Sequence, residues 1–258
     1  MNKSNLIITI LLFILASICF IFFDVVPVTI LEDPIANNLL CGFISRIGLS
    51  LLFGWMLYQY GGRKMMMFDK TFLKSFVWSL PCFMVAFINF PTYGLITNSV
   101  YFTRTDLLGY YTLYIIGVAV VEELIFRGAL IVLMGDVFNH KKHKPLFVTL
   151  ICAIIFSLFH LSNLRTDFSN IKEVLFQCLY TLLIGAMLVV TMLKTKNIWL
   201  CMLIHAIFDF GGMLVIYQVC GGDPWSDVVF WVLTIVSGVL CAGHIIFTLI
   251  KLEKDYVS

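Results

Sequence analysis

Residues 115–134 read IIGVAVVEELIFRGALIVLM, an apolar run long enough to cross a bilayer as a helix. Three charged residues, Glu122, Glu123 and Arg127, lie in the middle of this run. A charge at the centre of a membrane helix costs roughly 2.5–3.5 kcal/mol, whereas each Leu, Ile, Val or Phe contributes only about 0.3–0.6 kcal/mol. The three charges nearly cancel the insertion free energy of their helix, so we expect them to face partners at a functional site inside the protein.

The composition predicts a polytopic membrane protein. The chain has 258 residues, 61% hydrophobic and 12% charged, whereas soluble domains are about a quarter charged. Apolar segments of roughly membrane-spanning length lie near residues 5–23, 39–60, 72–96, 107–134, 146–163, 174–193, 197–218 and 228–250. We therefore predict an all-α fold, a bundle of about eight transmembrane helices that forms a single transmembrane domain over residues 1–258.

The basic residues predict the orientation of this bundle. Most of the 17 Lys and Arg residues belong to the termini and to alternate loops. The intervening loops hold only Arg104, Arg165 and Lys172. Because cytoplasmic loops are enriched in Lys and Arg, the pattern predicts that both termini lie in the cytoplasm, which agrees with an even number of helices.

Cysteine usage and net charge narrow the range of functions. The eight cysteines are scattered through apolar segments without a CxxC pair, so we interpret them as small buried apolar residues. The net charge is +2, and no basic cluster with interleaved aromatic residues indicates binding of nucleic acid. The expected partner is the lipid bilayer itself.

The charges of the quoted helix divide into a pair and a single carboxylate. Glu123 and Arg127 are four residues apart, so they share a helix face and can form an ion pair. Adjacent helical residues diverge by about 100°. We therefore expect that Glu122 cannot face the same spot as Glu123 and is left to face another helix.

Two later segments each carry residues at helical spacing. FSLFH places Phe156 one turn before His160, at a polar segment end that we expect to stop inside a cavity, and HAIFD places His205 one turn before Asp209. Because polar groups are costly in lipid, we expect the three segments to share one cavity. A carboxylate with two imidazoles can activate water and stabilise an oxyanion. The same set, with Glu122, is also a candidate zinc ligand set, although the HExxH signature is absent.

The three motifs together carry a family resemblance. EELIFR fits EExxxR, FSLFH fits FxxxH, and HAIFD fits Hxxx[ND], in this order over about residues 120–210. The chain thereby resembles the CAAX protease and bacteriocin-processing family (CPBP, also called Abi) of intramembrane endopeptidases. The resemblance implies a catalytic core at about residues 105–215. It also implies hydrolysis of a membrane-associated peptide or lipidated protein substrate.

Carried over by position, the resemblance implies a role for each residue of the first two motifs. Glu122 would activate the attacking water with the assistance of His160. Glu123 and Arg127 would form an orienting or structural pair, and Phe156 would have a structural role beside His160.

The third motif departs from the common family pattern. His205 and Asp209 are implied to stabilise the oxyanion or to bind a metal, and many family members carry Asn where this chain has Asp209. An ionised Asp cannot donate a hydrogen bond to an oxyanion. Asp209 therefore stays protonated, ligates a metal or orients His205, and we favour orientation. The family has been described both as metalloproteases and as metal-independent glutamate proteases. No cofactor is certain, and Zn²⁺ held by Glu122, His160 and His205 is the one candidate.

Other functions fit parts of the pattern. A non-proteolytic membrane regulator or a bacteriocin self-immunity protein of the same fold would need none of the catalytic chemistry. The charges would then be a structural ion cluster that locks the bundle. A proton-coupled transporter is disfavoured because no inverted repeat is visible. Short loops and a high content of Phe and Ile favour a bacterial plasma membrane.

Overall fold

The structure of the chain, a computed structural model, describes residues 28–59, 62–67, 71–165 and 171–257. It is an all-α helix bundle, as predicted. The predicted segment near 5–23 lies outside the described residues. Of the described helices, five spans are long and apolar enough to cross a membrane: Pro34–Gln59, Leu80–Thr97, Lys144–Leu164, Ile171–Thr195 and Val228–Tyr256. The number of transmembrane helices and their orientation stay predictions.

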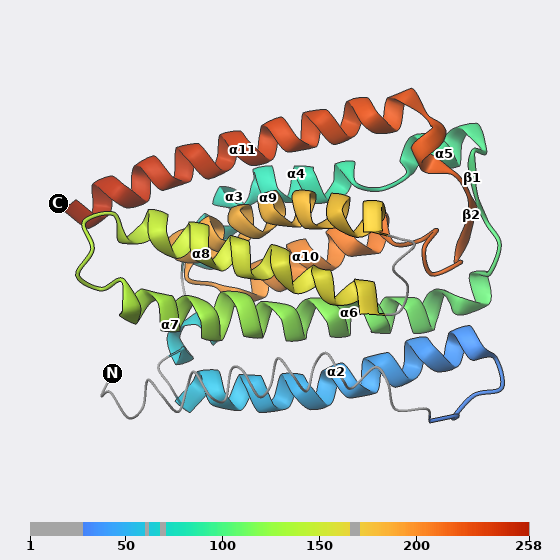
Figure 1. Ribbon diagram of the computed structural model, residues 1–258, viewed down its shortest axis with the longest axis horizontal. Coiled ribbons are helices and arrows are strands. Elements are labelled where there is room, and N and C mark those ends of the chain that lie inside the picture. Colours follow the sequence, from blue (N-terminus) through green and yellow to red (C-terminus); the bar gives the residue numbers. More distant parts are fainter. Residues whose placement is uncertain (1–27, 60–61, 68–70, 166–170, 258) are drawn as a thin grey trace.

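The helices pack around the short helix α10 (Ile198–Gly212). It contacts α6 (Leu108–Glu123) on one side and α4 (Leu80–Ile88) on another. The helix α2 (Pro34–Gln59) packs along α6, and α8 (Lys144–Phe159) along α9 (Ile171–Thr195). The long α11 (Val228–Val257) covers α4 and α9 at the side of the bundle opposite α2 (Figure 1).

The charged segment at residues 115–134 is part of a continuous helical rod. After α6 the chain makes a π-helical turn, η3 (Leu124–Ala129), and continues as α7 (Leu130–Val137). Every residue from Val121 to Leu130 is buried. The charges of this rod therefore face protein on all sides, and π-helical turns occur often at functional sites.

Two predicted segments are less regular than expected. The segment near 72–96 breaks into α3 (Phe72–Trp78), α4 and α5 (Thr92–Thr97). The sequence predicts bends at Pro81 and Pro91, and both breaks lie beside a proline. Pro81 is in the first turn of α4, where a proline is tolerated, and Pro91 directly precedes α5. The segment near 197–218 is helical only to Gly212. Its end leads to β2 (Cys220–Gly222), which pairs antiparallel with β1 (Val100–Phe102).

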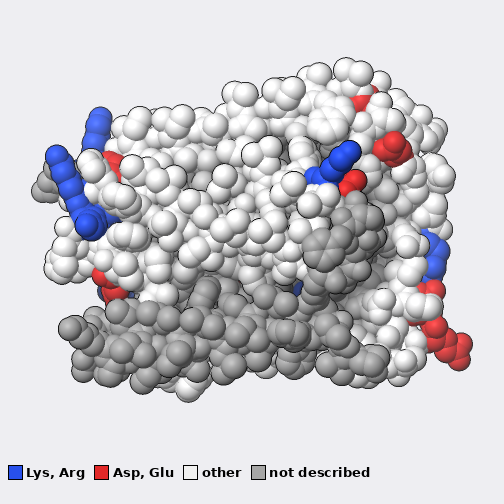
Figure 2. Space-filling model, in the orientation of Figure 1, with Lys and Arg blue, Asp and Glu red and all other residues white. Residues whose placement is uncertain are grey.

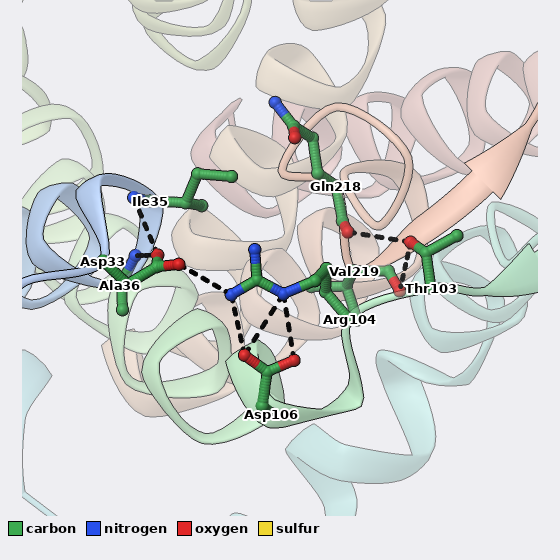
Figure 3. Close-up of polar contacts among 8 residues, drawn as sticks. All are labelled: Asp33, Ile35, Ala36, Thr103, Arg104, Asp106, Gln218 and Val219. Atoms are coloured by element: carbon green, nitrogen blue, oxygen red, sulfur yellow. Dashed lines mark hydrogen bonds and ion pairs between the residues drawn. The ribbon is translucent and has the colours of Figure 1, made fainter.

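A polar network holds the β1–β2 end together (Figure 3). Arg104 Nη2 donates hydrogen bonds to Asp33 Oδ2 at 2.9 Å and to Asp106 Oδ2 at 2.7 Å. The other oxygen of Asp33 caps the start of α2. Thr103 Oγ1 donates to the backbone oxygen of Gln218 at 3.1 Å. The network thus joins the starts of α2 and α6 to the segment that follows α10.

Charged side chains gather at the two ends of the molecule. In Figure 2, long Lys or Arg side chains project from the end that holds the C-terminus, and several Asp and Glu side chains lie at the opposite end. At the basic end, Lys194 Nζ donates to Asp255 Oδ2 at 2.7 Å, and Tyr256 Oη donates to the backbone oxygen of Asn139 at 3.0 Å. The surface between the ends is mostly uncharged in this view, which is typical of a protein that spans a bilayer.

Candidate active site

The polar residues of the three predicted segments line one cavity of about 140 Å³. Glu122 comes from α6, and His205 and Asp209 come from α10. His160 is the residue that follows α8, at the start of the short 3₁₀ segment η4 (His160–Arg165). The sequence thus correctly predicted that α8 stops inside a cavity shared with the other two segments.

His205 lies between three carboxylates. Its Nδ1 is 2.7 Å from Glu123 Oε1. Its Nε2 is 3.3 Å from Asp209 Oδ2 and 3.8 Å from Glu122 Oε2. The expectation that Glu122 and Glu123 cannot face the same spot is therefore wrong. The two nitrogens lie on different edges of the imidazole, so side chains that diverge along α6 approach the same ring from two sides.

The predicted ion pair within the rod is present. Arg127 Nη1 lies 2.9 Å from Glu123 Oε1, and both side chains are fully buried. None of the three guanidinium nitrogens has a hydrogen-bond partner among the described residues, so the contact is an ion pair without hydrogen-bond alignment. The guanidinium carbon also lies 4.1 Å from the ring centre of Phe156. A single carboxylate oxygen of Glu123, Oε1, therefore contacts both Arg127 and His205.

Phe156 connects the guanidinium to the second histidine. Its ring meets the His160 ring edge to face, with centroids 4.9 Å apart. The Nδ1 atom of His160 lies 2.9 Å from the backbone oxygen of Phe156. A ring that donates from Nδ1 to a carbonyl keeps Nε2 as the nitrogen able to accept a proton. Phe156 thus sets the position of His160 through both its ring and its carbonyl.

A residue outside the three motifs holds the end of α10. The Tyr111 hydroxyl of α6 donates to the backbone oxygen of Phe210 at 2.6 Å and approaches that of Asp209 at 3.2 Å. Tyr111 is completely buried. This contact connects α6, which carries Glu122, to the last turn of α10, which carries Asp209. No motif in the sequence pointed to Tyr111.

The break between α4 and α5 packs against the same helix end. Asn89 Nδ2 donates to the backbone oxygen of Phe208 at 2.8 Å. A Cβ atom added to Gly211 would lie 2.9 Å from the Cα atom of Phe90. Gly211 therefore permits close packing of the two backbones.

Part of the remaining cavity wall comes from η4 and α9, and Arg46 of α2 and Tyr217 after α10 also line the cavity. The sequence did not predict the lining residues on α9. Asn163 Nδ2 donates to Gln177 Oε1 at 2.9 Å, and Tyr180 lies further along the same wall. Because these polar residues are separated from the motifs by the loop before α9, no local spacing could reveal that they share the cavity.

The residues do not fit a zinc ion as they are arranged. Among the described residues, no three His, Cys, Asp or Glu side chains form a group that could hold a metal ion. The Nδ1 atom of His205 is engaged by Glu123 and that of His160 by a backbone oxygen, so only the Nε2 atoms of the two rings could ligate a metal. The side chains alone therefore carry the proposed chemistry.

Comparison with known proteins identifies one similarity. Residues 104–211 match the family model described as type II CAAX prenyl endopeptidase Rce1-like. The matched range contains all three motifs and the whole charged cluster. No curated protein matches the chain.

Proposed function

Since residues 104–211 match the Rce1-like family of type II CAAX prenyl endopeptidases, we propose that this multi-pass membrane protein hydrolyses a peptide bond of a membrane-associated peptide or lipidated protein. One observation carries the proposal. A carboxylate and two imidazoles from three segments of the chain line one small cavity inside the bundle.

In the proposed reaction, Glu122 is the general base. The cavity of about 140 Å³ has room for a few water molecules, at about 30 Å³ each. The Glu122 carboxylate takes a proton from one water molecule while the oxygen of that water attacks the scissile carbonyl. The same carboxyl group then returns the proton to the leaving amine as the C–N bond breaks. Nε2 of His160, whose Nδ1 is engaged by its own helix, orients the water.

His205 is the proposed donor to the oxyanion. In its doubly protonated form it donates from Nδ1 to Glu123 and presents the Nε2–H to the cavity between Asp209 and Glu122. Asp209, 3.3 Å from Nε2, orients the ring. Arg127 holds the Glu123 carboxylate in place, and this carboxylate in turn holds Nδ1 of His205.

The proposal extends to substrate and location. The family description names prenyl endopeptidases, so a prenylated peptide is the first substrate to examine. The composition favours a bacterial plasma membrane, where an unmodified hydrophobic peptide is the alternative substrate.

The test uses purified protein reconstituted in vesicles with farnesylated and unmodified peptides of the same sequence. Mass spectrometry would identify the bond that is cut. We expect His160→Ala to reduce cleavage strongly and His140→Ala, in the α7–α8 loop, to leave it unchanged. If neither peptide is cut, a non-proteolytic regulator becomes the better account. If His160→Ala cuts at the parent rate, His160 does not take part in the reaction as proposed. Activity that disappears together with stoichiometric zinc would contradict the metal-free step.

A further inference from the structure

A larger cavity lies apart from the proposed active site. It is a groove of about 720 Å³ between α3, the start of α4 and α11. None of its lining residues lines the active-site cavity. Its walls are mostly apolar and include Leu73, Val77, Trp78 and Phe247. Lys74 is a basic residue of the lining. Its volume lies within the usual range for ligand sites, roughly 300–1,000 Å³.

The apolar walls of the groove open outward. The exposed fraction is 73% for Leu73, 56% for Val77 and 54% for Phe247. The indole ring of Trp78 stacks on Phe247 with ring centres 5.7 Å apart. In a protein that spans a bilayer, such a surface meets acyl chains rather than water.

Cationic side chains surround the indole at one end of the groove. Lys251 Nζ lies 4.7 Å from the ring centre of Trp78 and 4.6 Å from that of Phe247. Lys194 Nζ lies 5.5 Å from the Trp78 ring and also donates to Asp255 at 2.7 Å. Lys74 is an exposed residue of the groove lining. Ammonium groups on aromatic faces leave N–H donors to bind an anion.

Trp78 supplies an additional donor. Its Nε1 atom is buried and has no hydrogen-bond partner among the described residues. A buried N–H without a partner is unfavourable and is rare in folded proteins. A ligand oxygen that displaces the side chains covering this N–H would satisfy it.

From these contacts we propose that the groove binds an anionic glycerophospholipid. An acyl chain lies against Leu73, Val77 and Phe247. The phosphate oxygens accept hydrogen bonds from Lys74, Lys251 and Trp78 Nε1. Basic pockets beside transmembrane helices recognise phosphate head groups in this way. The bound lipid would join α3 to α11, and the inference does not depend on the proposed peptidase activity.

The test measures lipid binding by the purified full chain in neutral detergent, with native mass spectrometry and thermal unfolding as readouts. Dioleoyl phosphatidylglycerol is compared with dioleoyl phosphatidylcholine, which has the same acyl chains, and with glycerol 3-phosphate, which has none. The variant Lys74→Gln/Lys251→Gln removes two basic groups from the groove. The control Lys141→Gln/Lys142→Gln removes two from an exposed loop at the same end.

We expect phosphatidylglycerol to bind and to raise the melting temperature of the parent and of the loop control. The groove variant should bind it roughly 10- to 30-fold more weakly, the loss expected for two basic groups near a head group. Trp78→Phe keeps the stacked ring and removes the N–H donor, so it should weaken binding by a smaller factor. This variant tests the proposal even if the double variant does not fold. Equal effects of phosphatidylcholine or of glycerol 3-phosphate would overturn the proposal, as would an equal loss in the loop control.

Discussion

The buried pair of Glu123 and Arg127 allows a quantitative stability prediction. At 2.9 Å and an effective dielectric constant of about 20, their attraction is about 6 kcal/mol before desolvation is counted. Replacing Arg127 by Met leaves a fully buried carboxylate with His205 as its neighbour at 2.7 Å. Breaking one side of a buried pair typically costs about 3–5 kcal/mol. At about 2–4 °C per kcal/mol for a chain of this size, we expect the melting temperature to fall by about 6–20 °C.

A double-mutant cycle distinguishes this pair from simple packing. Glu123→Gln and Arg127→Met should each destabilise the protein, and the double variant should lose less than the sum, by about 0.5–3 kcal/mol. Thermal unfolding in one detergent, followed by circular dichroism and by exposure of buried cysteines, measures all four proteins. Additive losses, or an Arg127→Met variant that melts within a degree or two of the parent, would refute the reasoning.

Three further predictions concern residues around the site. Tyr111→Phe should lower stability by about 1–2 kcal/mol and reduce kcat, because it frees the end of α10; unchanged turnover would contradict this positioning role. Gly211→Ala should lower the melting temperature, whereas Gly238→Ala, where a Cβ meets open space, should not; equal effects would contradict the close contact. The backbone N–H of Ala36 and the Arg104 guanidinium lower the pKa of Asp33. The contacts of the ionised Asp33 carboxylate therefore stabilise the fold above the ordinary pKa of Asp, about 3.9. This stabilisation is lost as the pH falls through the lowered pKa. The melting-temperature difference between the parent and Arg104→Met should accordingly be present at pH 7 and shrink below about pH 4, and a difference that grows in acid would contradict it.

Much of the site was accessible from the sequence because its signals are local. Spacing of four residues predicted the ion pair of Glu123 with Arg127, and the cost of charge in lipid predicted that the three motif helices share a cavity. The approach of Glu123 to His205 was not predictable in this way. It depends on the rotation of α6 against α10, which is set by distant contacts such as the Tyr111 hydroxyl on the α10 carbonyls.

The fold shows the same division between local and distant signals. Apolar segment length predicted the helices of the described residues to within several residues at most ends. The breaks on either side of α4 lie at Pro81 and Pro91, where the prolines predicted bends. The pairing of β1 with β2 was not predicted, since it depends on packing across the bundle. The π-helical turn after Glu123 likewise has no signature in an apolar sequence, because its residues fit an α-helix equally well.

The most direct test of the proposed mechanism is the single-turnover rate of Glu122→Gln on a peptide that the parent cuts. The substitution preserves volume and removes the base, so we predict a rate lower by about 10²–10⁴-fold with an unchanged melting temperature. The matched control, Glu173→Gln at the exposed start of α9, should cleave at the parent rate. A Glu122→Gln variant that cleaves as fast as the parent would contradict the assignment of Glu122 as the group that activates water.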